Sequence, residues 1–153
     1  MAGAAQQGGP IQIFVTGSTV TTPILVTGAV TDYGKATSVT KTGKVDENGN
    51  FEKVVLQKGG FWIDATALNK KLNGVQPSID RTHCALVFKG SGPTTVFKGT
   101  GAYAGISGSV EVEVEFEFAG IAPRLPSGKR NFGDKAQPVA QYGNVTGSGS
   151  VKF

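Results

Sequence analysis

GTGAYAGISGSVEVEVEFEFAG, residues 99–120, contains the longest unbroken two-residue alternation in the chain. One set of alternating positions is apolar: Val110, Val112, Val114, Phe116 and Phe118. The other set is acidic: Glu111, Glu113, Glu115 and Glu117. A helix would scatter the two sets around its axis, whereas a pleated strand places them on opposite faces. The stretch therefore predicts a long strand with one apolar face.

Glycine recurs just before this strand, at Gly99, Gly101, Gly105 and Gly108. Glycines at this density weaken a regular strand and indicate a turn, bulges or close packing of backbones. The whole chain has 23 glycines among 153 residues, with 39% hydrophobic and 17% charged residues, which is typical of short strands joined by tight turns. Its length predicts a single domain.

Shorter alternating runs, bounded by turn residues, occupy most of the remaining sequence. We expect strands at residues 11–17, 23–34, 36–43, 51–60, 60–68, 81–92, 94–101, 106–120 and 141–153. Asn48-Gly49 predicts a hairpin turn, and further turns are expected at residues 32–34 and 90–93. A single turn of helix is expected at residues 67–74, because a glycine commonly follows a helix end.

Eight or nine strands with almost no helix predict an all-β fold. Such a chain either forms a β-sandwich or closes into a barrel, and closure removes the exposed strand edges. We therefore expect residues 11–153 to form one antiparallel β-barrel of about eight strands, with the β-sandwich as the alternative. Residues 1–10 are expected to be a disordered or weakly held tail.

The charge and the apolar content of the chain bear on its partners. The net charge is +4, but the basic residues are spread out and form no block among aromatic residues, so no nucleic-acid partner is expected. No apolar run approaches the roughly 20 residues that cross a bilayer, so no membrane insertion is expected. The first ten residues lack the features of a signal peptide.

Few residues could carry catalysis. Same-face glutamates on a strand stand about 6.6–7 Å apart, a spacing that could suit paired carboxylates. The simpler interpretation is that the apolar face of this strand is buried, so that its glutamates face solvent or pair with lysines on neighbouring strands. Glu111 and Glu117 are the candidates for reaching a pocket at a barrel mouth. His83 could form an acid–base pair with Asp80 or Asp64.

The single cysteine, Cys84, rules out an intramolecular disulfide and a cysteine-based metal site. One His and one Cys cannot supply a zinc set, and the acidic residues do not follow the spacing of a calcium loop. No glycine-rich segment has the form of a phosphate-binding loop. No metal and no cofactor is therefore predicted, and Cys84, in register with Leu86 and Phe88, is expected to be a small buried apolar residue.

Aromatic side chains are the candidates for a ligand pocket inside the barrel or at its mouth. An eight-stranded barrel leaves room for one small ligand. The predicted ligand-binding residues are Trp62, Phe61, Tyr33, Phe88, Phe97 and Tyr103. The alternative, which the sequence supports equally, is that these rings fill the core.

Residues 99–116, GTGAYAGISGSVEVEVEF, resemble the glycine pattern G-x-G-x-[YF]-x-G-[ILVA]-x-G-x of allene oxide cyclase-like and dirigent-like β-barrels, including small bacterial members. Residues 61–67, FWIDATA, and 30–34, VTDYG, look like earlier strands of those bacterial proteins. The resemblance implies an eight-stranded barrel that is often oligomeric and holds hydrophobic ligands, and it favours a secreted or cell-surface location. Some relatives are cyclases that confine a reactive chain. No catalytic Glu or Cys set of a cyclase maps onto this sequence.

Two functions compete on these grounds. The first is a non-catalytic barrel that binds a small hydrophobic molecule, and the second is an isomerase or cyclase acting on a flexible oxylipin-, terpenoid- or polyketide-like substrate. A third is an exported structural or interaction module, and the resemblance allows a homo-oligomer. Residues 121–141, interrupted by Pro123, Pro126 and Pro138, are expected to form a lid or rim over the barrel mouth or an arm to a neighbouring subunit.

Overall fold

The computed structural model describes residues 7–17, 19–80, 82–121, 126–127 and 137–153. Within these residues the chain forms nine strands and one helix. In chain order they are β1 (Gly8–Thr16), β2 (Thr21–Gly28), β3 (Asp32–Val39), β4 (Phe51–Leu56), β5 (Gly59–Asp64), α1 (Thr66–Leu72), β6 (Ser78–Asp80), β7 (Ala85–Gly101), β8 (Ser107–Ile121) and β9 (Gln137–Lys152).

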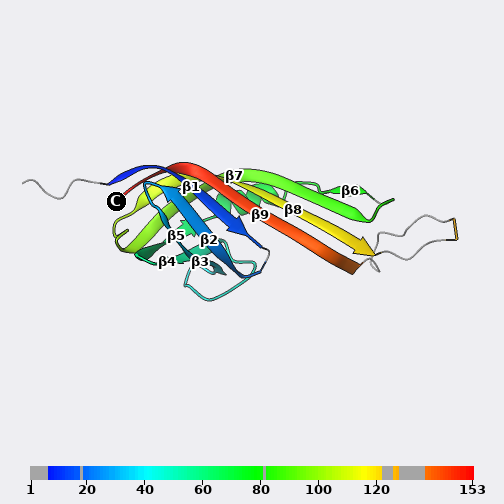
Figure 1. Ribbon diagram of the computed structural model, residues 1–153, viewed down its shortest axis with the longest axis horizontal. Helices are drawn as coiled ribbons and strands as arrows, with labels where there is room; N and C mark the ends of the chain where they lie inside the picture. The colour runs from blue at the N-terminus through cyan, green and yellow to red at the C-terminus, as the bar shows by residue number, and fades with distance from the viewer. Residues whose placement is uncertain (1–6, 18, 81, 122–125, 128–136) are drawn as a thin grey trace, which may run out of the picture.

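Eight strands close an antiparallel β-barrel (Figure 1). The order around the barrel is β5-β4-β3-β2-β1-β9-β8-β7, and β7 pairs with β5 to complete the ring. The ninth strand, β6, is short and pairs with the outer edge of β7. The predicted all-β barrel is therefore confirmed, and the β-sandwich alternative is wrong.

The three longest strands continue past the barrel. β1 pairs with β9 only between Asn144 and Lys152, and β5 pairs with β7 only from Thr95 onward. β8, in contrast, pairs with β7 along its length to Ala85. The resulting sheet projects from one side of the barrel (Figure 1). We call it the extension: residues 85–91 of β7, 113–121 of β8 and 137–143 of β9, with β6 at its edge.

The alternation in β8 places its side chains as the sequence predicts. Val110, Val112 and Val114 are buried, while Glu111 and the other glutamates face outward. The inward positions of β9 opposite them are small: Gly149 pairs with Val110 and Gly147 with Val112. Large inward side chains of one strand therefore fill the space left by glycines of the next.

One end of the barrel is closed by a packed cluster. The Phe61 and Tyr103 rings lie 6.2 Å apart, edge to face, and Tyr103 meets Phe153 at 5.7 Å. The Tyr103 hydroxyl donates a 2.6 Å hydrogen bond to Asp32, whose carboxylate also accepts from the backbone N–H groups of Tyr33, Gln57 and Lys58. Three parts of this end meet at the carboxylate, since its donors come from the start of β3 and from the β4–β5 and β7–β8 connections.

The turn expected at residues 32–34 lies earlier in the chain. β2 ends at Gly28, the Thr31 hydroxyl donates to the Gly28 carbonyl oxygen at 2.8 Å, and Asp32 already begins β3. The expectation was wrong because Asp32 is a buried acceptor of the closed end and not a turn residue. At Asn48-Gly49 the chain does turn, with the Gly49 N–H donating to the Asp46 carbonyl oxygen at 2.9 Å, but residues 40–50 form one long connection between β3 and β4. Neither Asn48 nor Gly49 has a positive φ, so the predicted two-residue hairpin turn is wrong.

The turn expected at residues 90–93 is also wrong, because β7 runs through it as one strand. The glycines serve a different purpose: α1 packs directly against them. A Cβ on Gly92 would lie 3.0 Å from the Leu68 Cα, and one on Gly90 would collide with the Leu72 side chain. Pro93 lies where neither β6 nor β5 pairs with the outer edge of β7, so its missing N–H costs no hydrogen bond on that edge.

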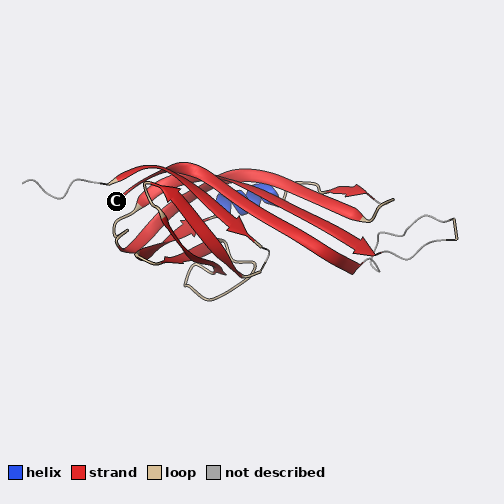
Figure 2. Cartoon of the chain, viewed as in Figure 1, coloured by secondary structure: helices blue, strands red, loops and turns tan. Residues whose placement is uncertain are grey.

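The predicted helical turn is confirmed as α1, which Figure 2 shows beneath the long strands where they leave the barrel. Of the expected tail, Gly8 to Pro10 instead belong to β1, and Gln7 exchanges two backbone hydrogen bonds with Phe153 at 2.7 and 2.8 Å. Residues 1–6 lie outside the described part of the chain.

Residues 137–141, which were expected in a long loop, are the start of β9, and Ile121 pairs with Gln137 at the far end of the extension. The proposed lid, rim or arm falls on residues 122–136. Apart from a turn at Pro126-Ser127, that segment lies outside the described residues, so the proposal stays a prediction.

Gly149 and Gly105 provide a test of the packing between β8 and β9. A Cβ on Gly149 would collide with the Ser109 carbonyl oxygen, whereas nothing lies within 4 Å of one on Gly105. We expect Gly149→Ala to lower the free energy of unfolding by about 3 kcal/mol or more, because backbone must move. Gly105→Ala, strained only by its φ of +81°, should cost about 1 kcal/mol. Urea unfolding checks both, and equal costs would contradict the packing argument.

The Asp32 cluster predicts a pH dependence of stability. Burial raises the pKa of Asp32, but the hydrogen bonds from Tyr103, Lys58, Tyr33 and Gln57 outweigh it, so the net pKa lies below the ordinary 3.8. The stabilisation is thus complete above pH 3.8 and is lost as the pH falls through the lowered value. We expect Asp32→Asn to be less stable than wild type at pH 7, with a difference that shrinks in acid.

Tyr103→Phe serves as the companion variant, because it removes only the hydroxyl from the same cluster. It should cost about 1–2 kcal/mol at pH 7, the cost of leaving one buried acceptor short of a partner. Urea unfolding of both variants between pH 2 and 7 measures these effects. A difference between wild type and Asp32→Asn that stays constant over this range would refute the assignment.

Candidate functional site

The barrel end opposite the Asp32 cluster holds a cavity of about 690 Å³. Its lower wall is formed by inward side chains of the barrel strands, and its rim by three connections at the same end. The rim consists of Gly17, Thr19 and Val20 between β1 and β2, residues 47–50 between β3 and β4, and α1 with Asn73. The cavity is thus a partly open part of the barrel interior. The packed core closes it toward the Asp32 end, and turns and α1 border its opening.

Most of the cavity wall is aliphatic. Alternate residues of each barrel strand point inward, and at this end they are largely Val, Ile and Ala. The apolar lining residues are Ile13, Val15, Val20, Ile24, Ala36, Ile63, Ala65, Leu68, Leu72, Phe88, Val112, Val114, Phe116 and Val145. A wall of this kind favours a ligand with an apolar body.

Four inward polar side chains interrupt this wall. Thr22 and Thr94 are buried, and the Thr94 hydroxyl donates to the Val110 carbonyl oxygen at 2.8 Å. Ser38 on β3 and Glu52 on β4 face each other across the hairpin, and the Ser38 hydroxyl donates a 2.6 Å hydrogen bond to Glu52 Oε1. Among the lining residues, Glu52 therefore brings a carboxyl into the interior.

The second oxygen of Glu52 is available to a ligand. No hydrogen bond to Oε2 is found among the described residues, and no unpartnered side-chain oxygen is sealed from solvent there. Burial raises the pKa of Glu52 above the ordinary 4.5, and the hydrogen bond from Ser38 opposes part of that rise. The environment therefore favours the neutral form of this carboxyl more than water does.

The rim of the cavity is polar and rich in amides. Asn48 and Asn50 come from the β3–β4 turn, and Asn69 and Asn73 from the helix region. The Asn69 side chain donates to the Asn50 side-chain oxygen at 2.9 Å, which joins the helix to the turn. Glu47 is the charged residue of this rim. Together with Glu52 it gives the cavity two carboxyls.

Of the six aromatic residues predicted to bind a ligand, the structure places one, Phe88, in the cavity wall. Phe61 and Tyr103 lie inside the barrel but at its closed end, in the Asp32 cluster. Tyr33 is 62% exposed on the surface. The binding role of these residues stays a prediction, since no ligand contact tests it.

Trp62 and Phe97 lie on the outer face of the barrel. Together with Phe51 they form a cluster in which each pair of ring centroids is 6.2 Å apart. The ammonium of Lys98 lies 4.3 Å from the centre of the Trp62 ring. Trp62 lies between the buried Phe61 and Ile63 in β5, so its side chain points away from the cavity.

The predicted catalytic candidates on β8 also lie outside the cavity. Glu111 and Glu117 are exposed on the outer face, and Glu115 lies 3.5 Å from the ammonium of Lys89 on β7. That is the pairing with a cross-strand lysine that the sequence favoured. Glu113 and Glu115 border a shallow polar hollow on the same outer face.

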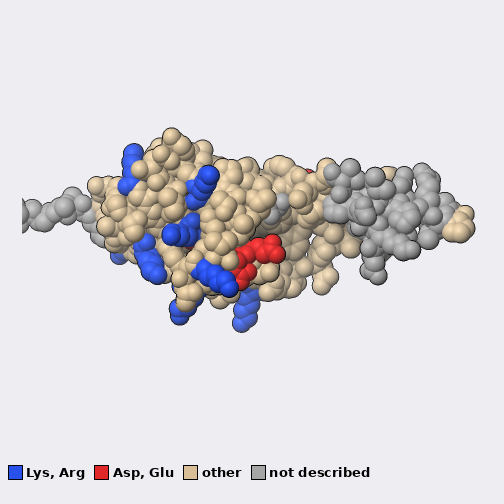
Figure 3. All heavy atoms as spheres, turned by 90° about the horizontal axis from the view of Figure 1, so that it is seen from below, with Lys and Arg blue, Asp and Glu red and all other residues tan. Residues whose placement is uncertain are grey.

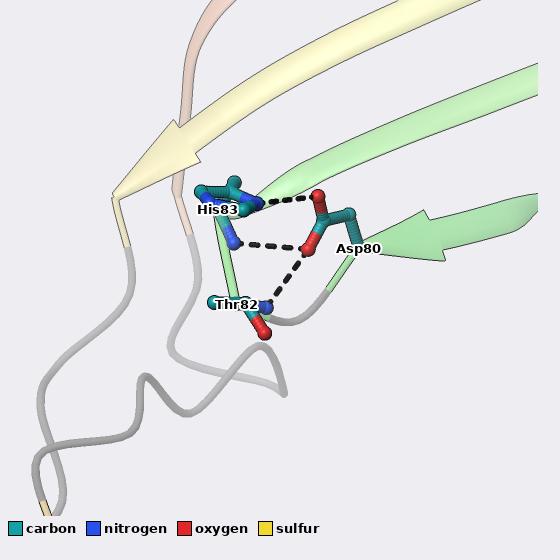
Figure 4. Close-up of polar contacts among 3 residues, drawn as sticks. All are labelled: Asp80, Thr82 and His83. Carbon is teal, nitrogen blue, oxygen red and sulfur yellow. Dashed lines mark hydrogen bonds and ion pairs between the residues drawn. The ribbon is translucent and has the colours of Figure 1, made fainter.

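His83 is paired with Asp80, as one of the two predicted arrangements required. The ring Nδ1 lies 2.7 Å from Asp80 Oδ2, and Oδ1 accepts from the backbone N–H groups of Thr82 and His83 at 3.0 Å (Figure 4). The hydrogen bond from His83 lowers the pKa of Asp80. This pair forms the exposed turn between β6 and β7 and does not reach the cavity.

Asp64 and Cys84 have local roles. Asp64 accepts hydrogen bonds from the N–H and hydroxyl of Thr66, the first residue of α1, at 2.9 and 2.6 Å. Cys84 is buried, as predicted, but it lies in the turn before β7 with a φ of +54° and not on a strand. Asp64 is therefore not joined to His83.

Within the described residues no group of three or more His, Cys, Asp or Glu side chains is arranged to hold a metal ion. The described helix is too short to span a membrane. Comparison with known proteins found no match: no family model, no curated protein and no solved structure matches this chain.

Glu52 was missed from the sequence although a signal for it exists. In residues 51–56, FEKVVL, Glu52 shares its parity with Val54 and Leu56, both of which are buried. Phe51, Lys53 and Val55 form the outward set. A single carboxyl on the aliphatic face of a predicted strand is the pattern that would have identified it.

The raised pKa of Glu52 predicts that its ionisation destabilises the fold. Between the ordinary 4.5 and the raised folded value, the native state binds more protons than the unfolded state, so this group lowers stability as the pH rises. We expect Glu52→Gln to match wild type below pH 4.5 and to be more stable above it. Chemical unfolding from pH 3.5 to 8 measures the difference.

Glu113→Gln is the matched control, because it makes the same change on the exposed outer face of β8. Its stability relative to wild type should vary much less with pH. If Glu52→Gln were less stable than wild type at pH 8, the proposed cost of ionisation inside the cavity would be wrong.

Proposed function

We propose that this protein binds a small, predominantly apolar molecule inside its β-barrel. The observation that carries the proposal is the 690 Å³ cavity, whose volume lies in the range of about 300–1,000 Å³ typical of small-molecule sites. Its aliphatic wall would contribute affinity in proportion to the apolar area of the ligand. The polar rim and Ser38–Glu52 would orient the ligand.

The architecture supports a preformed site. The barrel below the cavity is closed by hydrogen-bonded strands on all sides, and the Asp32 cluster seals its other end. α1 is held by its packing on Gly90 and Gly92 and by the Asn69–Asn50 hydrogen bond. A site whose walls are already ordered loses little conformational entropy when a ligand binds.

The second candidate is an isomerase or cyclase, and Glu52 is the observation that favours it. A carboxyl with a raised pKa in an apolar cavity can give or take a proton from a confined substrate. The resemblance of residues 99–116 to allene oxide cyclase-like barrels suggests flexible oxylipin-, terpenoid- or polyketide-like substrates. Binding is the simpler proposal, because it needs only the cavity.

A pair of identical substitutions tests the binding site. Val112 lines the cavity, whereas Val55 is 56% exposed on the outside of β4. We expect the neutral apolar dye N-phenyl-1-naphthylamine to become fluorescent with wild type and with Val55→Phe. Val112→Phe should weaken dye binding by about tenfold, because a ring would occupy part of the cavity.

An external dye is needed because Trp62, the only tryptophan, lies on the outer face and would not report on the cavity. Circular dichroism should first show that both variants are folded. Equal dye binding by the two variants would place the apolar site elsewhere. No binding of this dye or of a panel of neutral apolar compounds by wild type would refute the proposed function.

A further inference from the structure

The charges around the cavity differ in sign from those of the whole chain. Lys and Arg outnumber Asp and Glu by 15 to 11 in the sequence, and lysines are spread over the barrel surface seen in Figure 3. The described residues that line the cavity nevertheless include no Lys and no Arg, and its two ionisable side chains are Glu47 and Glu52. The local field of the cavity is therefore set by carboxyls.

The two carboxyls occupy different depths. Glu47 belongs to the rim, on the turn between β3 and β4. Glu52 lies further in, because it is on the inward face of β4 beside Ser38 and in the same register as Val54. Its Oε1 accepts the hydrogen bond from the Ser38 hydroxyl, while Oε2 has no hydrogen-bond partner among the described residues and is not sealed from solvent. A ligand entering past Glu47 would thus meet a second acceptor inside.

From this arrangement we propose that the cavity selects organic amines: molecules with an apolar body and one ammonium group, which would pair with Glu52 Oε2. The proposal rests on the proposed function and adds the chemical class of the ligand. An ammonium ion offers hydrogen-bond donors to the free carboxylate oxygen, whereas a ligand carboxylate would face two like charges and no compensating cation.

The environment of Glu52 makes this selection effective. The aliphatic walls reduce the screening of a charge pair, and the pKa of Glu52 is raised because burial leaves its charge uncompensated. A bound ammonium would supply the missing opposite charge and hold Glu52 ionised. Neutral alcohols would make the same apolar contacts with the cavity walls, but their hydroxyl would form only a hydrogen bond with Glu52 and no ion pair.

Three ligands with one apolar body provide the test: 1-aminoadamantane, 1-adamantanol and adamantane-1-carboxylate. Isothermal titration calorimetry gives their affinities, and backbone amide NMR shifts of cavity residues such as Ala36 and Val112 locate them. At pH 7 we expect wild type to bind the amine about tenfold tighter than the alcohol, with the carboxylate weakest. Glu52→Gln should reduce the ratio of amine to alcohol affinity to about one, and Glu113→Gln should leave the order unchanged.

A pH series on wild type tests the same assignment without a variant. As Glu52 becomes protonated, amine affinity should fall toward that of the alcohol, and alcohol affinity should stay constant. The other charged residue of the cavity lining is Glu47 on the rim. Lys53 on β4 and Lys70 and Lys71 on α1 are exposed and outside the lining. Glu47→Gln separates the rim carboxyl from Glu52, and it should keep most of the preference.

The outcomes distinguish the two proposals. If the alcohol binds at the cavity residues but the amine binds no tighter, or if the amine preference survives in Glu52→Gln, the selection of amines is wrong and the binding barrel stands. If none of the three ligands shifts the cavity residues and N-phenyl-1-naphthylamine also fails to bind, both proposals are wrong.

Discussion

The pairing of large inward side chains on β8 with glycines on β9 is the constraint on which this structure depends. Val110 lies opposite Gly149, Val112 opposite Gly147, and Phe116 opposite Gly143. Each added Cβ on β9 would meet its partner strand closely, at 2.7 Å from Val110 for Gly147 and 2.9 Å from Phe116 for Gly143. The two strands can approach and bend together only because one of them carries no side chains at these positions.

The same alternation of large and small residues divides the barrel into a solid end and a hollow end. Phe61, Tyr103 and Phe153 fill the end where Asp32 gathers its hydrogen bonds. At the other end the inward residues are smaller, among them Ala36 and Ser38, and α1 lies to one side of the opening. The cavity is thus the space that small inward residues leave in a ring whose diameter is set by eight strands.

The sequence predicted those elements whose side-chain pattern has one physical cause. Residues 106–120 alternate because one face is buried, so the strand and its faces were predicted correctly. A turn was predicted at residues 90–93 because glycine and proline favour turns. In the structure Gly90 and Gly92 instead let α1 pack closely against a continuous strand. Trp62 and Phe97 were assigned to a pocket, or else to the core, because they are aromatic. Their direction depends on register, which composition does not give, and they lie outside.

The pairing of β1 with β9 has a consequence for synthesis. Gly8 is made long before Lys152, yet they are partners in the sheet. While the chain emerges from a ribosome, β1 to β5 can form successive hairpins, since each strand pairs with its neighbour in sequence. The ring cannot close until β9 has left the exit tunnel, and until then the outer edge of β1 has no intramolecular partner. From the emergence of β1 until that of β9 the nascent barrel is therefore an open sheet, whose unpaired strand edge is exposed to chaperones and to neighbouring chains.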